Sequence, residues 1–433
     1  MLQLKNFQAE DIAILQPRDR AIIGHEQGLG KSVIGSKLAV AGTIVVCPSH
    51  ARLGWDKHLR LWRPDLKRQV IRKRTDKLAD DTEVVIISYD MLKHVELPVP
   101  HILIVDESHY CKNKEAIRSQ EVAKLAQYAG KVYLLSGTPM PNRTRELWTQ
   151  LRILGATDLD YFEFTTRYSN GRSVQRTIKY RLKTGGYGRK TVKTWDDTGS
   201  SNVEELEQIV SKVMVRRLKS DVLSELPEKQ FESVPLIGGR VSKADRDVAD
   251  KMYKAITTGN KAPRVAFDKL SSARVELGQK KVDPSIEYIK DVLESTDKVI
   301  VFAWHTDVID RLKTELAEFN PVSITGSDSL DAKQAAEERF QTDPECRVII
   351  GNIIAMGTHW TLTAASRVIF VELDWVPGNL MQASDRAHRI GQDEQVLVSF
   401  IVFENTIEEA FINALIDKEL LIGDVIKPSE VAA

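Results

Sequence analysis

The sequence predicts an α/β protein with two parallel-sheet lobes, separated by a polar and partly helical insertion. Three observations lead to this prediction. The chain has 433 residues, of which 42% are hydrophobic, and this length exceeds what one core supports while the composition suffices for two. Short apolar, β-branched runs recur with amphipathic segments between them, which is the rhythm of βαβ units. This rhythm stops in a polar, turn-rich region and returns in the second half of the chain.

The expected strands fall into two groups of five. Those of the first lobe are Ala21–Ile23, Thr43–Cys47, Val84–Ser88, Ile102–Val105 and Lys131–Leu135. Those of the second lobe are Lys298–Ala303, Pro321–Ile324, Arg347–Gly351, Arg367–Val371 and Val396–Val402. The domain organisation predicted from them is a first lobe over residues 1–155, an insertion and bridge over 156–239, a second lobe over 240–421 and a tail over 422–433. We expect a helix at Asn202–Leu218 and a terminal bracing helix at Thr406–Leu421, because both segments are apolar at helical spacing.

Composition limits the function classes. Lys and Arg number 61 and Asp and Glu also number 61, so affinity for a polyanion has to come from local clusters of charge. Three cysteines lie far apart in no metal-binding spacing, which argues against a zinc site and a disulfide framework and favours a reducing compartment. The segment Met1–Arg20 is charged and lacks an apolar core, and the sequence contains no apolar run of about 18 residues, so we expect a soluble protein that is not exported and has no membrane partner.

A glycine-rich segment follows the first expected strand. It reads Gly24-His-Glu-Gln-Gly-Leu-Gly-Lys-Ser32 and precedes a helix-compatible stretch, the context of a phosphate-binding loop. Gly28 and Gly30 would let backbone N–H groups surround phosphate oxygens, Lys31 would reach the β and γ phosphates, and Ser32 would coordinate Mg²⁺. The alternative is a glycine-rich turn with a chance Gly-Lys-Ser, since His25 occupies the place of the first glycine in the strict pattern.

Two carboxylates follow the fourth expected strand, in His101-Ile-Leu-Ile-Val-Asp-Glu-Ser-His109. Ligands bind at strand ends in parallel sheets. Asp106 would hold Mg²⁺ through its water shell, and Glu107 would orient and deprotonate the attacking water. The alternative, an acidic N-cap after a strand, loses weight because the glycine loop lies upstream.

Together with further motifs, these segments resemble the Swi/Snf-like branch of the superfamily two helicases, over nearly the whole chain. The motifs are the adenine-reading segment Leu4–Gln8, the loop His25–Ser32, motif Ia at Val45–Ser49 with Trp55, motif Ib at Ile87–Asp90, motif III at Leu135–Pro139 with Asn142, motif IV at Val301–Ala303, motif V at Thr361–Ala365 and motif VI at Gln382–Gln392. The segments Met214–Val222 and Leu226–Lys229 resemble the bridge between the lobes. Three segments are similar in amino-acid sequence to the annealing-helicase (HARP-like) subgroup, namely Thr198–Asn202, Asp106–His109 and Glu372–Trp375.

The resemblance implies RecA-like lobes and a set of ATP-binding residues. These are Gln8 for the adenine, the loop residues Gln27, Gly28, Leu29, Gly30, Lys31 and Ser32 for the phosphates, and Gln382 of motif VI. It also implies that Arg386 and Arg389 act as arginine fingers on the γ-phosphate. The alternative for this pair is two arginines on a solvated helix face.

The sequence departs from the family pattern at three places. His25 replaces an aspartate, Gln27 replaces a methionine, and Gly357–Trp360 lacks the usual second glycine and leucine of motif V. Motif V couples DNA to ATP in relatives, so we expect the segment around His359 to alter that coupling.

The resemblance places nucleic-acid contacts on motifs Ia, Ib and V. The candidates are Arg52, Trp55, Ser88, Tyr89 and Thr361, with the nearby basic side chains Lys57, Arg60, Arg63 and Lys67–Arg74. A second basic cluster lies in the insertion between Gly171 and Trp195 and contains no acidic residue. We expect a loop or ribbon here that contacts DNA, with Arg181, Arg189 and Lys190 as candidate contacts, and the alternative for the cluster is a solvated charged loop. Trp304 and Trp360 are more typical of a core than of a base-stacking platform.

The sequence therefore predicts an ATP- and Mg²⁺-dependent translocase on double-stranded DNA that acts as a monomer and remodels or anneals DNA structures in repair or replication. We expect it in the cytoplasm of a bacterium or virus-infected cell, or in the nucleus if it is eukaryotic. One alternative is a strand-separating DNA or RNA helicase. Another is a scaffold that binds ATP and DNA without hydrolysis, which the intact Lys31, Glu107, Arg386 and Arg389 argue against.

Overall fold

The computed structural model describes residues 3–137, 144–181, 187–222, 229–236, 264–357, 360–374, 376–404, 408–409 and 412. These residues form two compact units. The first unit extends to Leu218 without Gln27–Leu29, and the second comprises Gln27–Leu29 and the chain from Lys219 onward.

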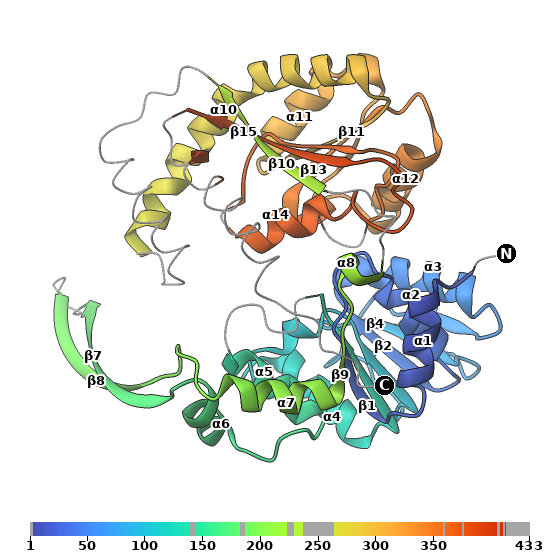
Figure 1. Ribbon diagram of the computed structural model, residues 1–433, viewed down its shortest axis with the longest axis vertical. Coiled ribbons are helices and arrows are strands. Elements are labelled where there is room, and N and C mark those ends of the chain that lie inside the picture. The colour runs from blue at the N-terminus through green and yellow to red at the C-terminus, as the bar shows by residue number, and fades with distance from the viewer. Residues whose placement is uncertain are drawn as a thin grey trace. The chain divides into compact units, whose positions relative to one another are not determined.

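The first unit is built on a parallel sheet of seven strands in the order β3-β4-β2-β5-β6-β1-β9 (Figure 1). The strands are β1 (Arg20–Ile23), β2 (Thr43–Cys47), β3 (Arg68–Val70), β4 (Val84–Ser88), β5 (Ile102–Val105), β6 (Lys131–Leu135) and β9 (Met214–Val215). Strands β2, β4 and β5 are buried along their whole length, which explains their nearly continuous Val and Ile content.

Helices cover this sheet. They are α1 (Asn6–Leu15), α2 (Lys31–Leu38), α3 (Arg52–Trp62), α4 (Ile117–Tyr128) and α5 (Leu147–Ile153), with the short 3-10 turns η1 (Ser49–Ala51), η2 (Ser108–Cys111) and η3 (Thr144–Glu146). Helix α3 buries Trp55 and Leu59 against the sheet. Gly35 allows this packing, because a Cβ there would lie 2.8 Å from the Trp55 ring.

Two helices and a β-ribbon follow in the same unit. Helices α6 (Tyr161–Tyr168) and α7 (Val203–Val213) form a small core with α5 through Leu147, Leu151, Phe164, Tyr168 and Leu206. Asp160 begins α6 with a capping box, in which its side chain accepts from the Glu163 N–H at 2.8 Å. Strands β7 (Arg172–Arg181) and β8 (Tyr187–Asp196) pair antiparallel in a sheet of their own.

The second unit has a parallel sheet of six strands in the order β10-β15-β14-β11-β13-β12. The strands are β10 (Lys229–Leu236), β11 (Val299–Ala303), β12 (Val322–Ile324), β13 (Val348–Asn352), β14 (Arg367–Phe370) and β15 (Val396–Phe403). The helices of this unit are α8 (Lys219–Val222), α10 (Arg264–Ser295), α11 (Thr306–Glu315), α12 (Leu330–Thr342), α13 (Ile353–Met356) and α14 (Pro377–Ser384), with the 3-10 turn η4 (Ala317–Phe319). Phe302, Phe370 and Phe400 stack in its core, with ring centroids 4.9 and 5.0 Å apart.

The ten strands expected from sequence are all present, with ends shifted by one residue at most. Strands β3, β9 and β10 were not expected, and β7 and β8 lie where a loop or ribbon was expected. The helix predicted over Asn202–Leu218 ends at Val213, because Met214 and Val215 pair with Ile22 and Ile23 at the sheet edge. The region expected between the lobes is divided, since its residues up to Leu218 belong to the first unit and β10 belongs to the second.

Some expected features lie outside the described residues. They are Thr138, Pro139 and Asn142 of motif III, Leu226–Glu228 of the bridge, His359 of motif V, Trp375, the tail over 422–433 and most of the terminal helix. Across the described ranges, no helix combines the length and apolar content needed to span a bilayer.

A buried ion pair in the second unit gives a test of its packing. Lys281 of α10 is fully buried and donates to Glu408 Oε1 at 2.9 Å and to the Ile401 carbonyl at 3.0 Å. Replacing Glu408 by Gln leaves a buried ammonium without its counter-charge, so we expect Glu408→Gln to lower the free energy of unfolding by about 3 kcal/mol. Urea unfolding followed by circular dichroism measures this loss.

The matched control replaces both partners by apolar residues of similar volume. We expect Lys281→Met/Glu408→Leu to unfold within about 1 kcal/mol of the wild type, because no charge is left buried. Equal destabilisation by the single and the double change would contradict this account of the pair.

Candidate active site

Three strand ends of the first unit form the base of the candidate site. Strand β6 lies between β1 and β5, and the register pairs Ile23 with Leu135 and Leu134 with Val105. The residues that come directly after these strands therefore leave the sheet at the same edge. The Ser136 N–H donates to the Ile23 carbonyl at 3.2 Å, which ties the motif III segment to the start of the glycine loop.

The glycine loop has the backbone conformation that a phosphate cradle requires. Gly28 has φ +87° and Gly30 has φ +75°, values that favour glycine. A Cβ on Gly30 would also lie 2.4 Å from the Gln8 side-chain nitrogen. Gln8 is buried and accepts from the Lys5 N–H, so the expected adenine-reading residue lies directly against the loop.

Lys31 and Ser32 occupy the first turn of α2, directly after Gly30. The Lys31 ammonium donates to the carbonyls of His25 and Glu26 at 2.9 and 3.2 Å. The Lys31 ammonium therefore lies inside the glycine loop, where phosphates would bind. Lys31 and Ser32 are both partly exposed, as residues that receive a soluble ligand must be.

His25 joins the loop to two other parts of the first unit. Its Nε2 lies 2.9 Å from Asp11 Oδ2, and both side chains are fully buried. Arg217 reaches Asp11 from the segment after β9, with its Nη2 2.8 Å from Asp11 Oδ1, and the Glu26 N–H donates to the Arg217 carbonyl at 3.0 Å. The histidine that departs from the family pattern therefore has a carboxylate partner from α1.

Burial and charge set the protonation of this cluster. Burial lowers the pKa of His25, and the contact with Asp11 opposes this shift without cancelling it. Burial raises the pKa of Asp11, but the contacts with His25 and Arg217 outweigh it and leave the pKa lowered. The cluster therefore contains a neutral imidazole at neutral pH, between an ionised carboxylate and the loop.

Asp106 is fixed at the end of β5 from two sides. The Trp55 indole N–H donates to Asp106 Oδ2 at 2.8 Å, and the Glu107 N–H donates to Asp106 Oδ1 at 3.0 Å. The Tyr89 hydroxyl donates to the Asp106 carbonyl at 2.6 Å. Because both carboxylate oxygens already accept a hydrogen bond, this geometry suits a metal held through water.

Glu107 has an uncommon backbone conformation, with φ 49° in a residue other than glycine. Such conformations cost free energy and concentrate at functional sites. The Glu107 side chain is buried, and its Oε2 lies 3.2 Å from His109 Nδ1. That nitrogen also lies 3.3 Å from the Ser136 hydroxyl, so the carboxylate is linked to the motif III segment.

The residues present fit a nucleotide with Mg²⁺. Mg²⁺ is usually bound by one or two protein oxygens together with substrate phosphates and water. Ser32 and Asp106 supply such oxygens, and within the described ranges no cluster of three or more His, Cys, Asp or Glu side chains forms a metal cage. The oxygens of Ser32 and Asp106 therefore fit a metal that arrives with phosphate.

Three residues of this unit that were predicted to contact nucleic acid are buried. Trp55 and Tyr89 are 1% and 5% exposed and Ser88 is fully buried. None of the three side chains is therefore accessible to a DNA strand in solution. The two aromatic residues pack in the cores on either side of the sheet and support Asp106 instead. Burial raises the pKa of the Tyr89 hydroxyl well above its usual value.

Arg52 is also held in place by the protein. Its guanidinium donates to the carbonyls of Ser49 and Ile71, and it is half-buried. These bonds fix the turn after β2, so a contact between Arg52 and DNA stays a prediction.

In the second unit, motif VI is bound to motif V. Arg389 donates to the Trp360 carbonyl at 3.0 Å and to the Thr361 hydroxyl at 3.2 Å, and burial lowers its pKa. The Leu362 N–H donates to the Arg386 carbonyl at 3.0 Å. Gln392 adds bonds to the carbonyls of Ala365 and Ala387.

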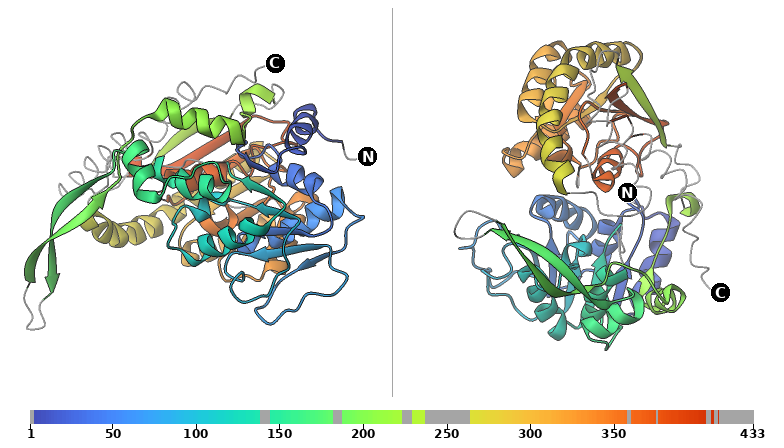
Figure 2. Two further views of the ribbon diagram at one scale, coloured as in Figure 1. Left: turned by 90° about the horizontal axis from the view of Figure 1, so that it is seen from below. Right: turned by 90° about the vertical axis from the view of Figure 1, so that its left-hand side faces the viewer.

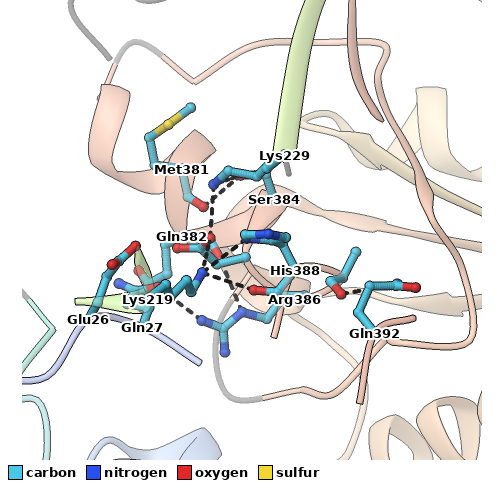
Figure 3. A network of polar contacts seen from close by, with 12 residues as sticks. Glu26, Gln27, Lys219, Lys229, Met381, Gln382, Ser384, Arg386, His388 and Gln392 are labelled. Carbon is cyan, nitrogen blue, oxygen red and sulfur yellow. Dashed lines mark hydrogen bonds and ion pairs between the residues drawn. The ribbon is translucent and has the colours of Figure 1, made fainter. Parts of the chain in front are cut away.

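A buried ionic cluster lies at the centre of motif VI (Figure 3). Lys219 and Lys229 each donate to Asp385 Oδ1 at 2.9 Å, and Lys219 also donates to the His388 carbonyl at 2.9 Å. Burial raises the pKa of Asp385, but the two lysines outweigh it and leave the pKa lowered. The two bridge lysines thus fix the turn that carries Arg386.

The other predicted site residues are distributed over both units. Gln382 lies in α14 and its carbonyl accepts from Arg386 Nε at 3.0 Å. Thr361 is half-buried, and its N–H donates to Glu337 at 2.6 Å. Trp360 is 5% exposed and belongs to the core, and Trp304 packs against that core. Lys190 is exposed on β8, whereas the side chains of Arg181 and Arg189 lie outside the described part.

Sequence reasoning missed the residues that support the site. Asp11, Arg217, Lys219, Lys229 and Asp385 had no predicted role. The spacing of Asp11 gives no signal, because its partner His25 follows 14 positions later on another element. Lys219 and Lys229 lie in the two bridge segments that the resemblance identified. Membership of those segments was the one sequence signal that could have pointed to a role for these lysines.

The chain matches two family profiles. The profile of the SNF2-related domain matches residues 15–238, and that of the helicase conserved C-terminal domain matches residues 284–391. These ranges contain all the motifs described above except the adenine-reading segment and Gln392.

Two curated relatives and one solved structure illustrate the similarity. The "SWI/SNF-related matrix-associated actin-dependent regulator of chromatin subfamily A-like protein 1 homolog" of Caenorhabditis elegans is 32% identical over 97% of this chain and 61% of its own length. The "DNA annealing helicase and endonuclease ZRANB3" of Mus musculus is 30% identical over 94% of this chain and 39% of its own. The "Sulfolobus solfataricus SWI2/SNF2 ATPase core in complex with dsDNA" is 22% identical, with a TM-score of 0.44 over 98% of this chain and 93% of its own.

His25 predicts a pH dependence of stability. Its pKa is lowered in the folded state, so the unfolded chain binds a proton more readily than the folded chain below about pH 6.5. The stability that the neutral imidazole contributes is therefore present above that pH and is lost as the pH falls through the folded pKa. We expect urea midpoints to fall between pH 7.5 and 5.5, and to fall less in His25→Asn.

The exposed His101, directly before β5, provides the control. His101→Asn is expected to follow the wild-type pH profile of the urea midpoint. An identical pH dependence in wild type and His25→Asn would show that His25 is not the titrating group.

Proposed function

The chain belongs to the SNF2-related family, and on that premise we propose that it is an ATP-dependent translocase on double-stranded DNA. The observation that carries the proposal is the pair of bonds from Trp55 and Tyr89 to Asp106. Trp55 and Tyr89 belong to motifs Ia and Ib, two of the motifs that face DNA in the family, and Asp106 is the candidate Mg²⁺ residue. A DNA-induced shift of either motif would act directly on the residue that completes the ATP site.

ATP binding is assigned to the loop between β1 and α2. The backbone N–H groups around Gly28 and Gly30 would bind the phosphates, with the dipole of α2 directed at them. Lys31 would exchange the carbonyls of His25 and Glu26 for phosphate oxygens. Mg²⁺, when bound beside Ser32 and Asp106, neutralises phosphate charge.

Glu107 is the candidate general base. Its position one residue after Asp106 suits a carboxylate that orients the attacking water while its neighbour serves the metal. The contact with His109 and the left-handed backbone hold it in one orientation. This division of roles supports hydrolysis, because a scaffold that only binds ATP has no need for a strained carboxylate.

Arg386 and Arg389 are assigned to the γ-phosphate. A planar guanidinium stabilises charge that spreads over the transferring phosphoryl group. The Lys219–Asp385–Lys229 cluster supports this assignment for Arg386, because it fixes the neighbouring backbone in the second unit. Arg389 also contacts motif V, so it is the better candidate to connect DNA contact with turnover.

The proposal is confined to the motor. The chain covers about 40 to 60% of the two relatives described above, so their full activities are not transferred. Annealing is the second candidate activity, because the name of the mouse relative describes a DNA annealing helicase. The annealing of complementary strands in the presence of ATP tests that activity separately.

Two substitutions test the ATP site. We expect Lys31→Ala to lose ATP turnover because the phosphates lose their cation. Glu107→Gln should bind ATP normally and hydrolyse it at least about 100-fold more slowly, because it lacks the general base. Phosphate release with and without duplex DNA measures turnover, and a fluorescent ATP analogue measures binding.

Lys37→Ala is the matched control for Lys31, because Lys37 is an exposed lysine on the same helix. Its turnover should equal that of the wild type. Near-normal DNA-stimulated hydrolysis in Lys31→Ala or Glu107→Gln would refute the assignment of the site.

A third substitution tests the arginine. We expect Arg386→Gln to reduce turnover by about 10³-fold with ATP affinity little changed, because the guanidinium acts mainly on the transition state. Arg339→Gln is the control, since Arg339 is an exposed arginine of α12 in the same unit. If Arg386→Gln weakens ATP binding without slowing hydrolysis at saturation, Arg386 is a ground-state contact instead.

A further inference from the structure

The ribbon β7–β8 concentrates positive charge in a protein without net charge. Its two strands contain seven Lys and Arg residues and a single acidic residue, Asp196 at the end of β8. None of the hydrogen bonds described above for the nucleotide site involves the ribbon. Charge of one sign on one element suits a polyanionic partner.

The ribbon is long and stands apart from the sheet of its own unit. Each strand has 10 residues, and the register runs from Arg172 opposite Asp196 to Arg181 opposite Tyr187. Figures 1 and 2 show the ribbon extending away from the helices of its unit. Among the described residues no third strand pairs with it. Isolated two-stranded ribbons are marginally stable in water, so a partner that covers this one would stabilise it.

The base of the ribbon is firmly attached. The Trp195 indole N–H donates to the Thr165 hydroxyl at 3.0 Å, and its ring meets Phe162 edge-on at 5.2 Å. Asp197 accepts from Arg145 and from the Tyr161 hydroxyl directly after β8. Because its base is held by these contacts, the ribbon stays attached to the rest of the first unit when its strands bind a partner.

Exposed donor groups are present along the described part of the ribbon. Gln175 lies opposite Lys193, and Thr177 lies opposite Thr191. These four side chains are exposed, as is that of Lys190. Ammonium, amide and hydroxyl groups are the side-chain donors that bind phosphate oxygens, and no carboxylate lies among them.

The dimensions of the ribbon suit a duplex. Ten residues per strand span roughly 30 Å, which is close to the ~34 Å of one DNA helical turn. The major groove is about 12 Å wide and admits a two-stranded β-ribbon. A ribbon of this length can therefore follow one groove for nearly a turn and contact the phosphates at its borders.

We propose that the ribbon β7–β8 is an additional DNA-binding element, outside the helicase motifs, that lies along a groove of double-stranded DNA. The inference rests on the proposed function, since it adds a second contact to the same duplex. Lys190 and Lys193 contact phosphates, so the ribbon increases affinity without reading sequence. A different role for the lysines would be to prevent pairing of the exposed strand edges with another chain.

The salt dependence of DNA binding separates these roles. The test variant is Lys190→Gln/Lys193→Gln, and the matched control is Lys124→Gln/Lys212→Gln, which removes two exposed lysines from α4 and α7 of the same unit. Fluorescence anisotropy with a labelled 30-base-pair duplex, without nucleotide, gives Kd over a series of salt concentrations. We expect the slope of log K against log salt to become shallower by ~1.8 in the test variant and to stay unchanged in the control.

Each other outcome overturns the inference. An unchanged slope in the test variant, or an equal change in the control, shows that the ribbon does not bind phosphate. An equal loss on a single strand of the same length contradicts the duplex assignment. A higher oligomeric mass of the variant in light scattering, with an unchanged slope, assigns the lysines to protection of the edges.

The binding experiment distinguishes a failure of the proposed function from a failure of the ribbon inference. If the wild-type chain does not bind the duplex, the proposed function fails. If the wild type binds and the test variant has the same slope, only the ribbon inference fails. Thermal unfolding of both variants confirms that the comparison is made between folded chains.

Discussion

The parallel pairing of β1, β6 and β5 is the constraint on which the candidate site depends. Register in this part of the sheet puts the glycine loop, Ser136 and Asp106 at one edge, although these segments are separated by many residues in sequence. The chemistry of the site then depends on the residues that come directly after each strand. Because the strands are buried on both faces, a shift in register would displace apolar side chains as well as the site, so the geometry is strongly fixed.

Buried polar contacts extend this constraint to the supporting residues. In the first unit, Asp11 connects α1, His25 of the loop and Arg217 beyond β9. In the second unit, Asp385 connects two bridge lysines with the turn of motif VI. In both cases a buried carboxylate binds side chains from separate elements, and removing one partner would leave charge buried without compensation. These clusters give Arg217 a supporting role in the first unit, and Lys219 and Lys229 a supporting role in the second.

Sequence patterns predicted the sheets well and the side-chain environments less well. Apolar β-branched runs identify buried strands, and glycine at Gly28 and Gly30 marks the loop, because both signals are local. The same patterns could not show that Trp55 and Tyr89 face the core, since an aromatic residue after a strand serves a core or a ligand equally well. The ribbon β7–β8 was expected as a loop or ribbon within turn-rich, basic sequence, but its strand bounds could not be predicted because its polar strands have no apolar face. Partners such as Asp11 and His25 depend on tertiary packing, which local periodicity does not encode.

The central claim is that ATP hydrolysis moves this protein along an intact duplex. Displacement of a third strand from a DNA triplex tests it most directly, beside an assay for unwinding of a forked duplex. The account predicts ATP-dependent triplex displacement without separation of the duplex strands, and no displacement with a non-hydrolysable ATP analogue. Fork unwinding without triplex displacement would contradict it and would identify a strand-separating helicase.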